Sequence, residues 1–211
     1  MSVVVAIKKN GKIYMGCDSQ VTCGGTRTTL KNSNNYKIWQ VQNAEHCLMG
    51  SVGNLRDACV IRTMDNLVTE YNIYRRHISF DFIVNKIVPD IIDRLQEAKY
   101  LKKGDSFDSM DSSFLFAFED QLYYIGFDGS VIEVEDYVAI GSGKNEAIGS
   151  LLSTEKEAPE ERIIKAIKAS AANDLYVDYP IILTNTETTK FEVITEKTEK
   201  SYLKSKKEES K

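Results

Sequence analysis

Two charged residues stand inside apolar, strand-like stretches near the start of the chain. Asp18 ends one stretch in the segment GCDSQ, and Lys37 lies early in another, in NYKIW. A lysine there either faces solvent or is buried beside a partner, and Asp18 could be that partner. In a buried pair, desolvation lowers the pKa of the lysine and the carboxylate raises it. The structural alternatives are that Asp18 only starts a turn and that Lys37 is a solvated strand residue.

The segment Gly50-Ser51-Val52-Gly53-Asn54 runs directly from a strand into a helix. Backbone N–H groups at such a junction, together with the helix N-terminus, can stabilise an oxyanion. Gly53 could equally be required only for a tight corner, since glycine adopts backbone angles that are unfavourable for other residues. The segment Gly141-Ser142-Gly143 could be a plain connector.

The strand that opens the chain supplies a candidate nucleophile. Its apolar residues start directly after Ser2, although the first residues of most domains are loose. Ser2 becomes the terminal residue once Met1 is removed, and aminopeptidases readily remove Met before a small residue. A terminal serine carries a hydroxyl and a free amine of ordinary pKa about 7.7–8.0, which can act as a general base. Together with Asp18, Lys37 and the two glycine segments, this start of the chain converges on Ser2 as the residue exposed at the processed chain end.

Hydrophobic patterns predict the strands that position these residues. Asn10-Gly11 between two apolar runs is a strong hairpin signal, because both central residues of a type I′ turn need positive φ. The first run shows no alternation, which suggests burial on both faces. A polar loop is expected at 22–35. Strands are expected at 3–7, 12–17, 36–42, 47–53, 114–118, 122–127, 131–134, 137–140, 181–184 and 191–195.

Apolar residues that recur every three to four positions predict helices between the strand blocks. Asn54 can cap the first helix, which extends to about Tyr71, and Ser79 can cap the second. Pro89 is expected to kink that second helix. Two further helices are expected around 146–152 and at 159–172. Strand blocks separated by helix pairs favour an α+β fold, a four-layer αββα sandwich with two packed sheets and helices outside each.

Composition restricts the function classes. A net charge of −4 and a pI near 5.4 argue against a nucleic-acid-binding surface. Neither a membrane-spanning run nor a signal peptide is recognisable, so a cytoplasmic protein is expected. The four cysteines form no CxxC pair and only two histidines are present, so we expect no metal site and no cofactor. Residues 197–211 are mostly charged and are expected to form a disordered tail after a single domain at 1–196.

Five segments in order carry a family resemblance: KKNGKIYMGCDSQVT, NNYKI, GSVGNLRDA, VAIGSG and ASAAND. The chain resembles the β-type proteasome family of N-terminal nucleophile hydrolases, and within it the bacterial HslV-type peptidases. Almost the whole chain takes part, from Ser2 to about Phe191. The resemblance implies the same four-layer fold.

The resemblance also implies roles for the residues already singled out. Ser2 falls on the family's N-terminal threonine nucleophile, and Asp18 and Lys37 fall on the aspartate and lysine beside it. Gly53 falls on the glycine whose amide forms the oxyanion hole. A protonated Lys37 would lower the pKa of the neighbouring hydroxyl and amine. Serine in place of threonine lacks the methyl group that helps to fix the hydroxyl rotamer.

Four further positions take roles from the resemblance alone. Ser142 and Asp174 fall on the serine and aspartate that orient the terminal amine. Substrate side chains are expected to meet the segment that contains Ser51 and Leu55. One departure concerns LYVDYP after Asp174, which lacks the Ser-Gly-Gly that β-type subunits often carry there.

The function implied is hydrolysis of unfolded polypeptides inside a ring of identical subunits. HslV-type rings depend on a hexameric ATP-driven unfoldase, and this chain has no GxxxxGK[ST] motif, so an ATPase would be a separate partner. Two alternatives remain, a non-catalytic scaffold subunit and an amidase that acts on a small amide. The Asp18 and Lys37 pair argues against the scaffold, whereas Ser2 in place of threonine argues for it.

Overall fold

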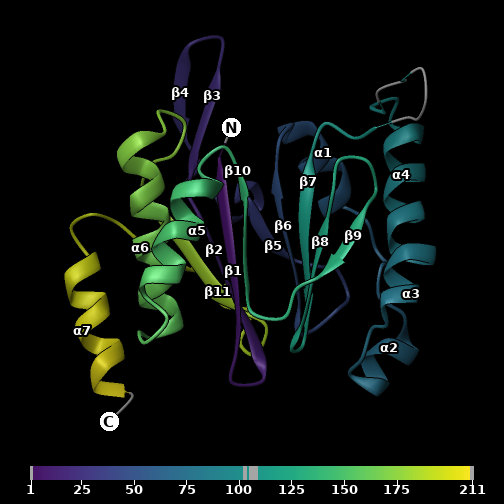
Figure 1. Cartoon of the computed structure of the whole chain (residues 1–211). Coiled ribbons are helices and arrows are strands. Elements are labelled where there is room, and N and C mark those ends of the chain that lie inside the picture. Colours follow the sequence, from purple (N-terminus) through teal and green to yellow (C-terminus); the bar gives the residue numbers. More distant parts are fainter. Residues whose placement is uncertain (1, 102–103, 105–108, 210–211) are drawn as a thin grey trace.

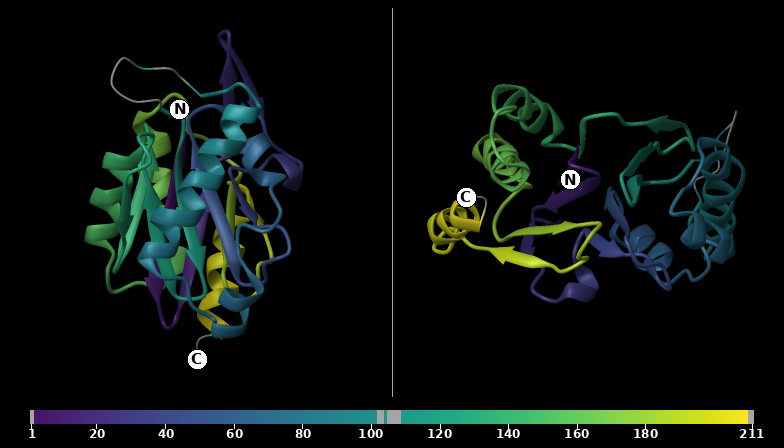
Figure 2. Two further views of the ribbon diagram at one scale, coloured as in Figure 1. Left: turned by 90° about the vertical axis from the view of Figure 1, so that its right-hand side faces the viewer. Right: turned by 90° about the horizontal axis from the view of Figure 1, so that it is seen from below.

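Two five-stranded antiparallel sheets pack face to face at the centre of the molecule, and helices cover the outer face of each (Figures 1 and 2). The structure is a computed structural model that describes residues 2–101, 104 and 109–209. The arrangement confirms the predicted four-layer αββα sandwich.

The first sheet has the strand order β10-β1-β2-β11-β12. Its strands are β1 (Val3–Lys9), β2 (Lys12–Cys17), β10 (Tyr137–Gly141), β11 (Ile181–Asn185) and β12 (Glu192–Ile194). Helices α5 (Lys144–Ser153) and α6 (Pro159–Asn173) cover its outer face. Strand β1 lies between β10 and β2, and its Val3, Val5 and Ile7 face the helices while Val4 and Ala6 face the other sheet. Burial on both faces explains why this strand shows no polar alternation.

The second sheet has the strand order β5-β6-β7-β8-β9. Its strands are β5 (Ile38–Gln40), β6 (Cys47–Val52), β7 (Ser113–Phe118), β8 (Gln121–Ile125) and β9 (Val131–Glu133). Its outer face is covered by α1 (Leu55–Arg62), α2 (Glu70–Arg75), α3 (Phe80–Phe82), the π-helical turn η2 (Ile83–Ile87) and α4 (Val88–Glu97). No helix in the described part of the chain is long and apolar enough to cross a membrane.

The two helices on this side differ in part from the prediction. The expected helix from Asn54 to Tyr71 is interrupted after α1, and Asn66, with φ +62°, lies in the break before Thr69 caps α2. At Pro89 a kink was predicted, and the structure has a π-helical turn just before it, while the helix continues through the proline. Proline has no N–H and its ring collides with the carbonyl four residues back, which a π turn relieves.

A hairpin of β3 (Gln20–Cys23) and β4 (Thr26–Thr29) stands where the sequence predicts a loop. Gly24 and Gly25, with φ of +54° and +79°, form its two-residue turn. The hairpin projects beyond the body of the sheets beside the N-terminus (Figure 1). A short 3₁₀ turn, η1 (Ser33–Asn35), follows it.

The prediction of a disordered C-terminal tail is corrected by helix α7 (Glu199–Glu209). Tyr202 and Leu203 pack against the apolar cluster of the first sheet, and the Lys168 ammonium lies 2.8 Å from the carboxylate of Glu199. Composition averaged over the segment hides the two apolar residues that anchor this helix. The structure therefore has a third helix, α7, on the side of the molecule that carries α5 and α6 (Figure 2).

Candidate active site

Strand β1 holds Ser2 at a fixed place between the two sheets, where the residue is 7% exposed. The Ser2 N–H donates to Ser142 Oγ at 3.1 Å, and the Ser2 carbonyl accepts from the Gly143 N–H at 3.4 Å. Gly141 pairs with Val3 and has φ +104°. A Cβ atom on Gly141 would lie 2.1 Å from the Ser2 carbonyl oxygen. Glycine is therefore required here for the backbone of Ser2 to lie so close.

Replacing Gly141 by alanine is expected to lower the free energy of unfolding by about 2 kcal/mol or more, because φ is positive and backbone atoms occupy the space. The matched control is Gly149→Ala in α5, where the added methyl group meets nothing within 4 Å. Alanine has the higher helix propensity, so this control should gain about 0.5–1 kcal/mol. Chemical denaturation of both variants measures the difference. Equal effects would contradict the close approach of Gly141 to Ser2.

Lys37 and Asp18 form a buried ion pair beside Ser2. Lys37 is 6% exposed and Asp18 is fully buried, and the Lys37 Nζ lies 2.7 and 2.8 Å from the two carboxylate oxygens. Its third acceptor is the Gln20 carbonyl, at 2.5 Å. The three N–H bonds of an ammonium thus have three acceptors, which identifies Lys37 as the protonated form. Among the alternatives, the buried pair is therefore the one present.

Backbone donors complete the surroundings of Asp18. The Val3 N–H donates to one carboxylate oxygen and the Gln20 N–H to the other, both at 3.0 Å. Burial raises the pKa of the Asp18 carboxyl, and the Lys37 ammonium with these two N–H groups opposes the shift. Asp18 thereby ties the first residues of β1 to the lysine.

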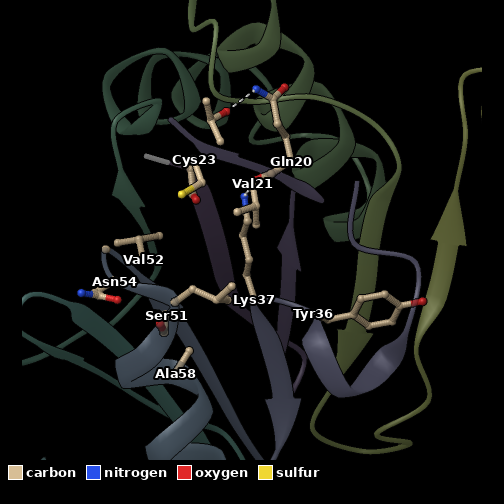
Figure 3. Close-up of a pocket in the computed structure, with 13 residues that line it drawn as sticks. Gln20, Val21, Cys23, Tyr36, Lys37, Ser51, Val52, Asn54 and Ala58 are labelled. Atoms are coloured by element: carbon tan, nitrogen blue, oxygen red, sulfur yellow. Dashed lines mark hydrogen bonds between the residues drawn. The ribbon is translucent and has the colours of Figure 1, made fainter. Parts of the chain in front are cut away.

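A cavity of about 320 Å³ opens over Ser2. Lys37 and residues 51–55 line it from one side, and residues 20–23 line it from the hairpin. Figure 3 shows the extended Lys37 side chain reaching toward Gln20, with Ser51 and Ala58 beneath it. Ser51 and Leu55, the predicted substrate contacts, both line this space. Their role in substrate binding stays a prediction.

Gly53 also lines this cavity, at the junction of β6 and α1. It has φ +120°, and a Cβ atom would lie 2.2 Å from the Asp111 carbonyl oxygen. No hydrogen bond within the described part of the chain uses the Gly53 N–H. The next residue, Asn54, caps α1 by accepting from the Arg56 N–H at 2.9 Å. Among the described residues the Gly53 N–H therefore has no hydrogen-bond acceptor, and Gly53 borders the cavity.

Asp174, predicted to orient the terminal amine, makes a local hydrogen bond, and its role stays a prediction. It lies at the C-terminus of α6, where its Oδ1 accepts from the Tyr176 N–H at 2.9 Å. Among described residues no hydrogen bond links its carboxylate to Ser142. The loop that follows Asp174 lacks the family's Ser-Gly-Gly, and the Tyr176 N–H in this loop donates to the Asp174 carboxylate.

Residues 20–23 belong to the site but carry no recognisable signal in the sequence. Gln20 contributes backbone groups to both Asp18 and Lys37, so its side-chain type is uninformative. Cys23 is exposed and lines the cavity, whereas Cys17 is buried and its thiol pKa is raised by that burial to about 12. Within the described residues, no group of three or more His, Cys, Asp or Glu side chains could hold a metal ion.

The chain is similar in sequence to known protease subunits. A family model described as "Proteasome subunit" matches residues 2–180. The ATP-dependent protease subunit HslV of Borreliella afzelii (strain PKo) is 30% identical over 194 residues, covering 88% of this chain and 96% of that protein. The subunit of the same name from Borreliella burgdorferi (strain ZS7) is 28% identical with the same coverage.

Solved structures share the fold at lower identity. HslV from Trypanosoma brucei has a TM-score of 0.64 at 18% identity, covering 87% of this chain and 98% of that one. The structure titled Thiobacillus denitrificans BPH in complex with epoxomicin has a TM-score of 0.68 at 18% identity, covering 92% and 99%. These structural similarities concern the fold.

Proposed function

The chain belongs to the proteasome subunit family and resembles HslV protease subunits, and from this premise we propose a peptidase with Ser2 as its nucleophile. The observation that carries the proposal is that Ser2, Lys37 and Gly53 line one cavity, with Lys37 held as an ammonium against Asp18. A nucleophile, a fixed positive charge and a free amide donor thus face the same space.

The proton steps follow from the protonation state of Lys37. An ammonium has no lone pair, so Lys37 cannot accept the proton of the Ser2 hydroxyl. Once Met1 is removed, the Ser2 nitrogen becomes an amine that can accept it near neutral pH. Ser142 Oγ, 3.1 Å from that nitrogen, would orient the amine. The positive charge of Lys37 favours the deprotonated hydroxyl and stabilises it electrostatically.

Attack forms a bond between Ser2 Oγ and the substrate carbonyl carbon. The carbonyl oxygen becomes an oxyanion that accepts from the Gly53 N–H, and the amine returns the proton to the leaving nitrogen as the amide bond breaks. A single oxyanion donor of this kind contributes roughly 3–4 kcal/mol. Water, deprotonated by the same amine, then hydrolyses the ester on Ser2 and restores the hydroxyl.

Substrate class and assembly are proposed by analogy with HslV. We expect unfolded polypeptides as substrates, a ring of identical subunits, a separate ATP-dependent unfoldase and a cytoplasmic location. We propose exposed aromatic residues on the outer helical layer as subunit contacts, since apolar surface that gathers in a patch marks protein–protein interaction sites. Among them Tyr74 is 84% exposed, Tyr71 65% and Phe80 42%.

Removal of Met1 and reaction at Ser2 test the proposal directly. The intact mass of purified protein is expected to lack Met1, and a peptide epoxyketone is expected to label residue 2, since that warhead needs a hydroxyl and an amine on one residue. Peptide mapping locates the label. Active protein that keeps Met1 would contradict the mechanism, and inactive protein that keeps it would favour the scaffold. Size-exclusion chromatography separates the ring from a small amidase.

A further inference from the structure

A buried polar pair lies directly behind the proposed oxyanion donor. Asp57 in α1 is fully buried and Ser112, just before β7, is 2% exposed. The Ser112 hydroxyl lies 2.8 Å from Asp57 Oδ2, and its oxygen accepts from the Asn54 N–H at 3.0 Å. One hydroxyl therefore joins the carboxylate of a helix to the backbone of the residue after Gly53.

This hydroxyl extends the pairing between β6 and β7. The last residue pair of the ladder is Val52 with Ser113. The Ser112 side chain then accepts from the Asn54 N–H, two residues after Val52. Gly53 lies between these two attachments. A Cβ atom on Gly53 would meet the Asp111 carbonyl oxygen at 2.2 Å and Ser112 Cα at 2.7 Å, so its backbone packs flat against this segment. The backbone of Gly53 is thus held by the strand pairing of Val52 before it and by the Asn54 hydrogen bond after it. On one face it packs against residues 111 and 112.

The position of the Asp57 carboxyl group fixes the direction of the hydroxyl. Ser112 Oγ also lies 3.3 Å from the Asn54 carbonyl, but a hydroxyl has one hydrogen and the shorter contact to the carboxylate is the stronger one. With the hydrogen on the Asp57 side, a lone pair of Ser112 faces the Asn54 N–H. Asp57 thereby determines which group accepts from the backbone beside Gly53.

We infer that Asp57 and Ser112 are positioning residues that hold the Gly53 N–H toward the oxyanion. The inference rests on the proposed function. Neither residue is assigned contact with the reacting atoms. Both act through the backbone of residues 53 and 54, so their removal is expected to weaken transition-state binding more than substrate binding.

Ser112→Ala is the primary variant. It is expected to lower kcat by about tenfold to 100-fold with KM nearly unchanged, since small misplacement of a catalytic group has effects of that size. The matched control is Ser153→Ala in α5, an exposed serine whose hydroxyl donates to the Gly149 carbonyl of the same helix, and wild-type kinetics are expected. Thermal unfolding of each variant identifies loss of fold.

Two inhibitors report on the oxyanion donor separately from substrate binding. In a peptide aldehyde, Ser2 Oγ bonds to the carbonyl carbon, the carbonyl double bond opens, and the hydroxyl proton passes to the new hemiacetal oxygen or to the amine. That oxygen occupies the oxyanion position, whereas the corresponding peptide alcohol forms no such bond. Ser112→Ala is expected to lower the affinity for the peptide aldehyde by the same factor as kcat. The affinity for the peptide alcohol is expected to stay unchanged.

Asp57 supplies a second, independent test. Asp57→Asn keeps an oxygen acceptor for Ser112, so it is expected to lose less of kcat and aldehyde affinity than Asp57→Ala. Asp65→Asn, at an exposed acidic residue, is the control and is also expected to lose less than Asp57→Ala. Equal weakening of aldehyde and alcohol, or unchanged kcat in folded Ser112→Ala and Asp57→Ala, would overturn the inference alone. Wild-type protein without Ser2-dependent hydrolysis would overturn the proposed function and this inference together.

Discussion

Ser2→Ala is expected to reduce peptide hydrolysis by about 10⁴-fold or more, since loss of a nucleophile removes the covalent route altogether. Ser2→Thr is the matched control and is expected to stay within about tenfold of wild type, because the hydroxyl remains and the β-branch restricts its rotamer. Ser2 borders a cavity of about 320 Å³. Alanine and threonine are both small, so removal of Met1 is expected in each variant.

A fluorogenic peptide substrate measures the loss, with intact mass confirming the terminal residue of every variant. Size-exclusion chromatography is expected to give the same assembly for Ser2→Ala as for wild type, since the change removes one oxygen atom. Residual activity in Ser2→Ala would point to another nucleophile. Cys23 is exposed and lines the same cavity, so sensitivity of that residual activity to a thiol reagent would identify it.

The sheets and the charged pair were predictable because their signals are local. The unbroken apolar run of β1 predicts a strand buried on both faces, and Asn10-Gly11 has the positive φ angles, +56° and +72°, that its turn requires. Lys37 stands out because a charge inside an apolar strand must find a partner. Asp18 was the nearest candidate, and the two side chains do meet.

The features that sequence analysis did not predict carry no recognisable pattern of their own. Ser112 and Asp57 are 55 positions apart, and neither residue type is unusual in its own element. The β3 and β4 hairpin is short and mostly polar, with Val21 and Cys23 as its apolar residues, so no long alternating pattern marks it. Asp174 was assigned from resemblance alone, and its predicted role beside the terminal amine stays a prediction.

Lys37→Met is expected to lower kcat by about 10²-fold to 10³-fold, the usual effect of removing one preorganised electrostatic group from a site. Methionine keeps much of the side-chain length and volume, so the cavity wall remains. The terminal amine and the hydroxyl of Ser2 also remain, but the positive charge that stabilises the alkoxide is absent. Steady-state kinetics on the peptide substrate measure this loss.

The same change is expected to lower the free energy of unfolding by about 3–5 kcal/mol, because it leaves the Asp18 carboxylate buried without its counter-charge. The double variant with Asp18→Asn removes that charge, so we expect it to recover much of the stability and none of the activity. Recovery of both would contradict the electrostatic role of Lys37 in catalysis. Loss of stability without loss of activity in Lys37→Met would contradict it as well.

The pH dependence of stability distinguishes the two variants. Burial already raises the pKa of Asp18 above its ordinary value of 3.8, and Lys37 opposes that shift. Without the lysine the pKa rises further, so the folded form binds the proton more tightly than the unfolded chain. Stability of Lys37→Met is then largest at low pH and falls as pH rises through the raised pKa. Denaturation at about pH 5 and about pH 8 should show a steeper fall for Lys37→Met than for the double variant, in which this carboxyl is absent. A fall of equal size in both would mean that Asp18 is not the buried charge that Lys37 compensates.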